Sequence, residues 1–353
     1  MGRPAHLCNL HGACSRAGKI ASCASTHTAL TLPGYRGRDV VKRLLLASPR
    51  GYCAGVERAV ETVERALAHY GSPVYVRKQI VHNSHVVEDL RARGAIFVDT
   101  LAEVPAGATV VFSAHGIAPA VRREAEDLRL TTIDATCPLV TKVHAQARRY
   151  AEAGYAVVLI GHAGHEEVEG TLGEAPDAIV LVQSAAHAER VSLPESRPLA
   201  YVTQTTLSVD ETNEIVSVLR RRFPRIAGPA REDICYATSN RQWAVKELLR
   251  EVDLLLVVGS PNSSNSQRLV DVALAEGTPA HLVEDLGDID ARWLDDCETV
   301  GLTSGASAPE RLVAEVCAWF AARGAEVAEQ QAVHEDVSFK LPVELRRAER
   351  AAA

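Results

Sequence analysis

A pattern that occurs three times constrains the fold of this 353-residue chain more than any other feature. In each copy a cysteine precedes a helix-like segment, and a polar loop follows 28 or 29 positions later. The paired positions are Cys53 with His82, Cys137 with His165, and Cys235 with Ser263. Because a repeat at near-constant spacing indicates copies of one structural unit, the sequence predicts three similar units of about 100 residues each.

The surroundings of Cys137 show how such a unit begins. This cysteine directly precedes Pro138, and proline is favoured at the first position of a helix because its missing N–H would be unpaired there. We therefore predict that Cys137 is a helix N-cap, where unpaired backbone N–H groups and the helix dipole favour a thiolate that can hold a metal. A small buried cysteine that packs as a hydrophobe is the alternative. The recurrence at Cys53 and Cys235 favours the metal ligand.

Alternating strand and helix patterns indicate an α/β fold. Apolar residues three or four positions apart predict a helix after each of the three cysteines. Short apolar runs predict strands at 44–47, 74–76, 95–98, 109–112, 156–160, 199–202, 254–258 and 299–302. We expect three similar βα domains with small, mostly parallel sheets, arranged with pseudo-threefold symmetry around one axis. The cysteines and polar loops follow strand ends, where open α/β sheets bind their ligands.

The domain boundaries are placed at the starts of the three copies. A chain of this length is too long for one simple core, and we predict a first α/β domain at 42–135, a second at 136–233, a third at 234–333 and a C-terminal tail at 334–353. Residues 1–41 carry none of the repeat signals and contain one acidic residue, Asp39, so we expect a disordered N-terminal extension without a secretory segment. Its cysteines, Cys8, Cys14 and Cys23, are expected to have no function.

The composition excludes several classes of protein. With 47% hydrophobic and 24% charged residues the chain is typical of globular proteins, and it contains no apolar run of the ~18 residues that a membrane helix needs. A net charge of -7 argues against a nucleic-acid partner. Eight widely spaced cysteines do not form a disulfide scaffold, and we expect Cys297 and Cys317 to be packing residues. We therefore expect a cytoplasmic protein that acts on a small molecule.

Three cysteines that meet on one axis could hold zinc or an iron–sulfur cluster. Structural zinc usually takes four ligands in local pairs, whereas ligands 84 and 98 residues apart fit a site that is closed by the docking of domains. A cubane cluster bound by three thiolates leaves one iron without a protein ligand. Such an iron can bind a substrate oxygen and pass electrons to it.

The remaining polar loops carry hydrogen-bonding side chains that suit an oxyanion or a diphosphate. These residues are His82, His115, His165, Thr205, Ser263, Ser264, Asn265 and Ser307. Taken singly, each has another explanation as a turn residue or a structural histidine. Glu167 is the best candidate acid in these loops, because a carboxyl group in a water-poor site can hold a proton near neutral pH. The alternative for Glu167 is a helix-start glutamate that the helix dipole stabilises.

Eight motifs, in order along residues 43–345, resemble the bacterial 4-hydroxy-3-methylbut-2-enyl diphosphate reductase family. They are Pro49-Arg-Gly-Tyr-Cys-Ala-Gly, Val81-His-Asn, Ser113-Ala-His-Gly, Asp134-Ala-Thr-Cys-Pro-Leu-Val-Thr-Lys-Val-His, Gly161-His-Ala-Gly-His, Thr203-Gln-Thr-Thr-Leu-Ser-Val-Asp, Asp233-Ile-Cys-Tyr-Ala-Thr and Gly305-Ala-Ser-Ala-Pro. The resemblance implies an iron–sulfur oxidoreductase of the non-mevalonate (MEP) isoprenoid pathway. Its reaction would be the last step, reduction of (E)-4-hydroxy-3-methylbut-2-enyl diphosphate to isopentenyl diphosphate and dimethylallyl diphosphate.

The resemblance also implies roles for the candidate residues. Cys53, Cys137 and Cys235 would hold a central [4Fe-4S] cluster whose open iron binds the substrate hydroxyl, and Glu167 would supply the proton. Thr205 would help to position the hydroxyl end of the substrate. The diphosphate would be bound by His82, His115, His165, Ser263, Ser264, Asn265 and Ser307. Reduced ferredoxin or flavodoxin would donate the electrons.

One departure and two alternatives remain. The family usually has proline where this chain has Glu166, so we expect a less rigid loop with a second carboxyl group beside the proposed donor. One alternative is a cluster that acts only as a Lewis acid, as in iron–sulfur dehydratases or quinolinate synthase, and that needs no external electrons. The other is a non-enzymatic binding protein whose cysteines hold zinc.

Overall fold

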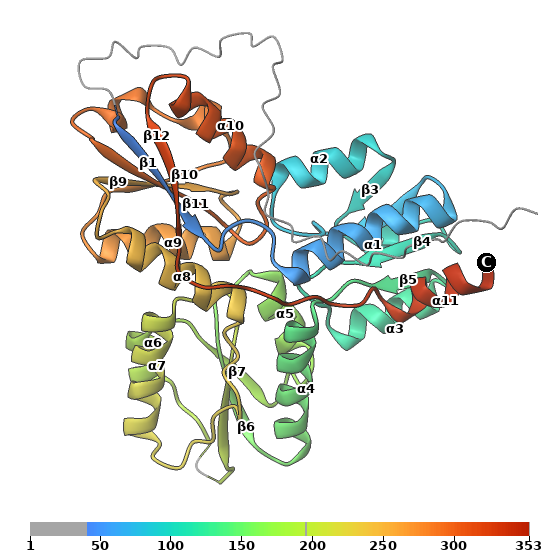
Figure 1. The fold of residues 1–353 in the computed structure, drawn as a ribbon. Helices are drawn as coiled ribbons and strands as arrows, with labels where there is room; N and C mark the ends of the chain where they lie inside the picture. The colour runs from blue at the N-terminus through green and yellow to red at the C-terminus, as the bar shows by residue number, and fades with distance from the viewer. Residues whose placement is uncertain (1–40, 195, 353) are drawn as a thin grey trace, which may run out of the picture. The chain divides into compact units, whose positions relative to one another are not determined.

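Three separate parallel sheets organise the chain (Figure 1). The computed structural model describes residues 41–194 and 196–352, which belong to one compact unit. The first sheet contains β3 (Ala95–Val98), β2 (Val74–Arg77), β4 (Thr109–Phe112) and β5 (Thr131–Asp134) in spatial order. The second contains β7 (Ile179–Val182), β6 (Ala156–Ile160) and β8 (Leu199–Thr203). The third contains β10 (Ala280–Val283), β9 (Leu254–Val258), β11 (Thr299–Ser304), β1 (Arg43–Ser48) and β12 (Glu326–Gln331). The expected α/β class with small parallel sheets is confirmed.

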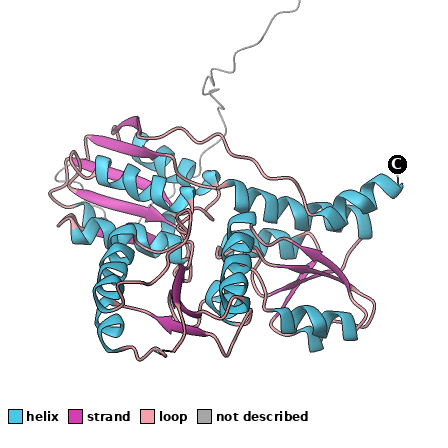
Figure 2. Cartoon of the chain, turned by 90° about the horizontal axis from the view of Figure 1, so that it is seen from below, coloured by secondary structure: helices cyan, strands magenta, loops and turns pink. Residues whose placement is uncertain are grey.

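Helices connect the parallel strands and flank the sheets (Figure 2), because a parallel pair needs a long crossover connection. The α-helices are α1 (Ala54–Tyr70), α2 (Ser84–Ala92), α3 (Pro119–Asp127), α4 (Pro138–Glu152), α5 (Glu166–Leu172), α6 (Ala185–Arg190), α7 (Val209–Arg222), α8 (Tyr236–Leu248), α9 (Ser264–Ala275), α10 (Glu310–Ala321) and α11 (Val343–Ala352). Three 3₁₀ turns are η1 (Leu101–Glu103), η2 (Leu286–Asp288) and η3 (Ala291–Leu294).

Each sheet is covered on both faces. In β6, Val158 and Ile160 pack into one hydrophobic core, while Val157 and Leu159 pack into another. Alternate residues of a strand point to opposite faces, so an uninterrupted apolar run such as Ala156–Ile160 belongs between two layers of helices. The same division into two cores occurs on the other two sheets.

Strand β1 lies in a different sheet from the one that the sequence predicted. We expected residues 42–135 to form the first domain, but β1 pairs with β11 and β12 of the third sheet, with Leu44 opposite both Val300 and Val327. The third sheet buries the apolar side chains of β1 on both faces, because Leu44 packs into one of its cores and Leu45 into the other. The remaining domain boundaries stay predictions.

The chain passes between sheets at the three cysteines. Strand β1 of the third sheet leads through Cys53 into α1, and β5 of the first sheet leads through Cys137 into α4. Cys235 follows the elements of the second sheet and precedes α8, which packs on β1. Each predicted unit therefore begins at a crossing between two sheets.

The C-terminal segment, predicted as a tail, is an ordered connection. From β12 it runs past α8 to α11 (Figure 1), and α11 packs against α1 and β5. Leu345 is fully buried in a core of the first sheet. Glu335 pairs with Arg241, and Arg58 donates a hydrogen bond to the carbonyl of Lys340. The segment therefore ties the third sheet to the first.

Two smaller expectations concern the chain ends and the other cysteines. Val41 is already buried, and the rest of the predicted extension, with Cys8, Cys14 and Cys23, lies outside the described residues. Cys297 is buried in a core of the third sheet, and Cys317 packs beside that core, as predicted.

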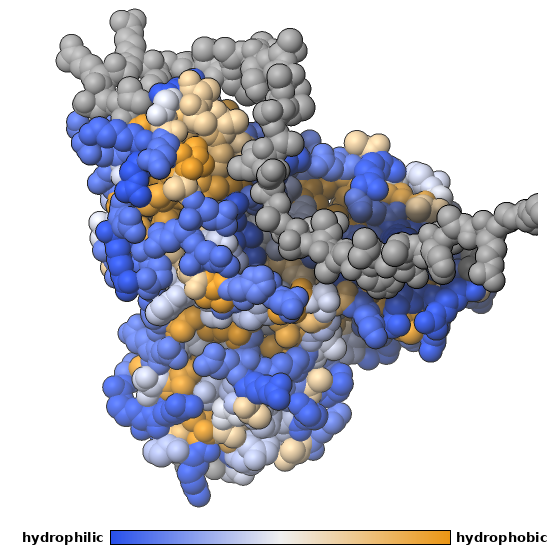
Figure 3. Space-filling model, in the orientation of Figure 1, coloured by the Kyte–Doolittle hydropathy of each residue, from blue (hydrophilic) through white to orange (hydrophobic). Residues whose placement is uncertain are grey.

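No helix in the described part of the chain is long and apolar enough to cross a membrane. On the face drawn in Figure 3, hydrophobic patches alternate with hydrophilic side chains.

Candidate functional site

The three repeat cysteines are helix N-caps whose side chains line one cavity. Cys53 precedes α1, Cys137 precedes α4 with Pro138 at the first position, and Cys235 precedes α8. All three are free and line a cavity of about 90 Å³. The predicted N-caps are confirmed.

A repeated backbone hydrogen bond fixes each cysteine. The N–H of Cys53 donates to the carbonyl of Ala306, that of Cys137 to Ala114, and that of Cys235 to Thr205. Each acceptor lies in a polar loop that follows β11, β4 or β8, in the sheet that the chain is leaving or has just left. In each case, a backbone carbonyl in the loop after a strand of one sheet therefore anchors the N-cap of a helix that packs on the next sheet along the chain.

Position 55 must be a glycine, because a side chain there would collide with the sulfur of Cys137. A Cβ atom on Gly55 would lie 2.7 Å from the Sγ of Cys137 and 3.7 Å from the Sγ of Cys53. Burial raises the pKa of Cys137 to about 12 and of Cys235 to about 11, and the negative charge of Cys53 acts in the same direction. Three crowded thiolates need a cation to offset their charge. Sulfur ligands are those that iron–sulfur clusters and zinc prefer, so the donor set fits such a group.

Thr238 lies against the cysteine cluster and was not predicted. Its hydroxyl is 3.2 Å from the Sγ of Cys235, and its oxygen accepts a hydrogen bond of 3.2 Å from the amide of Asn265. Because Asn265 donates to this oxygen, the hydroxyl hydrogen of Thr238 can point to the sulfur. Its position three residues after Cys235, on the same face of the first helical turn, could have indicated this contact from the sequence.

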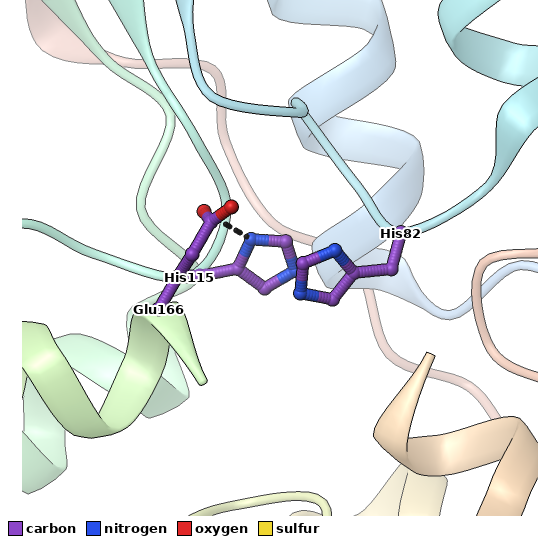
Figure 4. Close-up of side chains that lie close together, drawn as sticks. All are labelled: His82, His115 and Glu166. Carbon is purple, nitrogen blue, oxygen red and sulfur yellow. Dashed lines mark hydrogen bonds and ion pairs between the residues drawn. The ribbon is translucent and has the colours of Figure 1, made fainter. Parts of the chain in front are cut away.

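Three histidines form a cluster in the wall of the same cavity. The rings of His82 and His115 stack at 3.9 Å, and the ring of His165 lies edge-on to them at 5.2 and 5.8 Å. They come from the loops after β2, β4 and β6, so two different sheets contribute. Figure 4 shows His115 between His82 and the carboxylate of Glu166.

The hydrogen bonds at the Nδ1 atoms differ among the three rings. His82 has the side-chain oxygen of Gln79 at 3.3 Å, and His115 has Glu166 at 3.2 Å. His165 instead accepts a hydrogen bond from the backbone N–H of Glu167, so its Nε2 carries the hydrogen. The Nε2 atom of His82 is buried without a protein partner.

Charge is disfavoured at two of these rings. Burial lowers the pKa of His82, and the charges of the neighbouring histidines lower it further. Burial and His115 also lower the pKa of His165 to about 3, although Glu166 opposes this shift. An anion would supply both a hydrogen-bond partner for the Nε2 of His82 and a compensating charge.

Loops of the third sheet complete the cavity. Ser263 caps α9 by accepting a hydrogen bond from the N–H of Ser266, and the Oδ1 of Asn265 accepts one from Ala306. Ser307 donates to the carbonyl of His82 at 2.8 Å, and Ser264 donates to that of Thr206 at 3.2 Å. These contacts join the third sheet to loops of the first and second sheets at the site.

Glu167 is buried, with 2% of its surface exposed. Burial raises the pKa of its carboxyl group, although hydrogen bonds from Thr205 act to lower it. A carboxyl in this environment can hold a proton near neutral pH.

All the predicted site residues line this one cavity. They are Cys53, His82, His115, Cys137, His165, Glu167, Thr205, Cys235, Ser263, Ser264, Asn265 and Ser307. Their individual roles stay predictions. Thr206 and Thr238 also line the cavity and were not predicted.

Comparison with known proteins identifies a family. Residues 44–321 match the family described as LytB protein. The 4-hydroxy-3-methylbut-2-enyl diphosphate reductase of Acidothermus cellulolyticus is 61% identical over 308 residues, which cover 87% of this chain and 91% of that protein. The protein of the same name from Cutibacterium acnes is 58% identical over 308 residues, covering 87% and 95%.

Solved structures agree with this assignment. The E-1-hydroxy-2-methyl-but-2-enyl-4-diphosphate reductase from Plasmodium falciparum aligns with a TM-score of 0.86 at 39% identity, covering 88% of this chain and 99% of that one. A structure of (E)-4-hydroxy-3-methyl-but-2-enyl diphosphate reductase aligns with a TM-score of 0.56 at 30% identity, covering 80% and 99%. The resemblance of the eight motifs is confirmed, and the chain belongs to the LytB family, together with the 4-hydroxy-3-methylbut-2-enyl diphosphate reductases to which it is similar.

Proposed function

We propose that this protein reduces (E)-4-hydroxy-3-methylbut-2-enyl diphosphate to isopentenyl diphosphate and dimethylallyl diphosphate, the last step of the non-mevalonate isoprenoid pathway. Its relatives carry the name of that reductase. The observation that carries the proposal is a single cavity lined by three free thiols, three histidines and a buried carboxyl group. Such a cavity offers ligands for a metal cluster, partners for a diphosphate and a proton donor together.

Cys53, Cys137 and Cys235 would hold a [4Fe-4S] cluster in this proposal. The crowded, buried thiols and the close approach at Gly55 support a multi-iron group. When bound, the cluster supplies electrons for cleavage of the allylic C–O bond.

The diphosphate would lie against the histidines and the start of α9. The hydrogen on the Nε2 of His165 and the unpartnered Nε2 of His82 provide hydrogen-bonding positions for its oxygens. Backbone N–H groups at the start of α9, next to Ser263, suit an anion because the helix dipole is positive there. Ser264, Asn265 and Ser307 would add side-chain contacts, and Thr205 would position the hydroxyl end.

Glu167 would supply a proton. Replacing the hydroxyl group by hydrogen forms one C–H bond, releases water and consumes two electrons and two protons. A buried carboxyl whose pKa is raised can hold one of these protons until the C–O bond breaks. Its hydrogen bonds to Thr205 keep its two oxygens in a fixed orientation.

We propose reduced ferredoxin or flavodoxin as the electron donor. Ferredoxins work at potentials as low as about -400 mV, within the range of protein iron–sulfur clusters. A small redox protein would deliver the two electrons one at a time.

The proposal is tested with protein purified and loaded with iron and sulfide under anaerobic conditions. We expect about four irons and four sulfides per chain and reduction of the allylic diphosphate by chemically reduced viologen, with both products detected by mass spectrometry. Turnover without consumption of electrons would instead support a Lewis-acid enzyme. Bound zinc without turnover would support the non-enzymatic alternative.

A further inference from the structure

Glu166 lies at the first position of α5 and faces the loop after β4 (Figure 4). Its Oε2 atom lies 3.2 Å from the Nδ1 of His115 and 3.3 Å from the hydroxyl of Ser113. Both members of the pair are largely buried, with 17% of the Glu166 side chain and 14% of the His115 side chain exposed. The two residues come from different sheets, so this contact is a product of tertiary folding.

His115 differs from the other two histidines in its Nδ1 partner. The partners of His82 are neutral amides, those of Gln79 and Asn262, and His165 accepts a hydrogen bond from the backbone. Only His115, among the three rings, has a carboxylate at this atom. A carboxylate holds a hydrogen on Nδ1, and it also stabilises the ring when Nε2 takes up a second proton.

We propose that Glu166 is a positioning residue that accepts a hydrogen bond from the Nδ1–H of His115 and so supports the Nε2–H of this ring as a donor to the substrate diphosphate. The inference rests on the proposed binding of a diphosphate in this cavity. A charged donor forms a stronger hydrogen bond with a phosphate oxygen than a neutral one does. The carboxylate would also hold the ring in one orientation before the substrate arrives.

The charges around the pair are consistent with this role. Burial would raise the pKa of Glu166, but the hydrogen bonds from His115 and Ser113 and the charge of Lys78 lower it, so the carboxylate stays ionised. The other charged or titratable groups that act on this part of the site are His82, His165 and Glu167. Glu166 therefore places a negative charge beside the three rings.

A metal site is the competing explanation for this cluster. Ligand atoms of His82, His115 and Glu166 lie within 4.8 Å of one another. However, imidazoles bind metals in the plane of the ring, and these two rings stack with an angle of 15° between their planes. The lone pairs of stacked rings lie in two nearly parallel planes and do not meet at one point, so the geometry favours the ion pair.

The position in the helix offers two clean substitutions. Glu166 is the first residue of α5, where proline is tolerated because no intrahelical N–H bond is lost. Glu166→Pro therefore removes the carboxylate without breaking the helix, and Glu166→Gln removes the charge while keeping the shape. Glu169→Gln is the matched control, because Glu169 is an exposed acid in the same helical turn.

The test is calorimetric titration of the anaerobic, iron-loaded protein with inorganic diphosphate between pH 6 and pH 8. Repeating it in buffers with different ionisation enthalpies counts the protons taken up on binding. At pH 8 we expect Glu166→Gln and Glu166→Pro to bind diphosphate roughly tenfold more weakly than the unaltered protein and to differ from it in the number of protons taken up on binding. The same variants should raise KM more than they lower kcat.

Equal affinity and proton uptake at pH 8 in the unaltered protein and both Glu166 variants would overturn the inference. An equal loss in Glu169→Gln would also overturn it, because a general loss of negative charge would then be the cause. Unchanged iron content and melting temperature in Glu166→Gln would show that the fold is intact. Because the probe is inorganic diphosphate, failure of this inference is separate from failure to reduce the allylic substrate.

Discussion

The carboxyl group of Glu167 accepts two hydrogen bonds from a single residue, Thr205. The backbone N–H of Thr205 reaches Oε1 at 2.6 Å and its hydroxyl reaches Oε2 at 3.1 Å. The two residues follow β6 and β8, which are neighbours in the second sheet. Parallel strands end at the same edge of a sheet, and for this reason residues 38 positions apart meet at the cavity.

Glu167→Gln should separate proton delivery from binding. A positioned general acid contributes about 10²- to 10⁴-fold to the rate, or roughly 3 to 5 kcal/mol, and glutamine keeps the shape of the side chain without the proton. We expect kcat to fall by that factor while iron content and diphosphate affinity stay nearly unchanged. Steady-state kinetics with an iron assay measure both. If Glu166→Gln abolished turnover and Glu167→Gln did not, the donor would be Glu166.

Replacement of Cys53, Cys137 or Cys235 by serine should each remove most of the bound iron, because all three thiols line the proposed cluster cavity. Cys317→Ser is the control, since Cys317 packs beside a core of the third sheet. Iron and sulfide analysis after anaerobic loading gives the result. Full iron and activity in any of the first three variants would eliminate the three-ligand cluster.

Thr238→Val should make the reduction potential of the cluster more negative by tens of millivolts. The hydroxyl of Thr238 is close enough to donate to the Sγ of Cys235, and hydrogen bonds to cluster sulfurs stabilise the reduced form. Thr238→Ser keeps the hydroxyl and should leave the potential near its original value. A potentiometric titration followed by electron paramagnetic resonance measures the shift. No difference between the valine and serine variants would exclude the hydrogen bond.

Arg241→Ala should lower the free energy of unfolding by about 3 kcal/mol, because removing one member of a buried ion pair leaves its partners without compensation. Arg241 is fully buried, pairs with Glu335 and donates a 2.7 Å hydrogen bond to the carbonyl of Gly51 before Cys53. Urea unfolding measures the loss. Arg250→Ala is the control, since Arg250 is exposed and pairs with Glu247 three residues earlier in the chain. Similar unfolding curves for the two variants would contradict the structural role of Arg241.

Local sequence was sufficient for most of the strands and for the position of the candidate site, although β7, β10 and β12 were not predicted. Pro138 after Cys137 predicted a helix start, and apolar runs such as Leu254–Val258 predicted buried strands. Both signals depend on neighbours within one helical turn or one strand, so they can be recognised without the fold. Since ligands of parallel sheets lie at the ends of strands, the cysteines and polar loops could be identified as cavity residues in advance.

Contacts between distant segments needed the tertiary structure. Strand β1 pairs with the sheet whose cores bury Leu44 and Leu45. The residues near β1 in the sequence do not indicate which sheet that is. The contact of Glu166 with His115 likewise joins different sheets, and that of Arg241 with Gly51 joins residues 190 positions apart. Short-range patterns along the chain were enough for most of the local elements and for the chemistry at the strand ends. The packing of three sheets decided which of these side chains touch, because hydrogen bonds and burial act through space between residues that the chain keeps far apart.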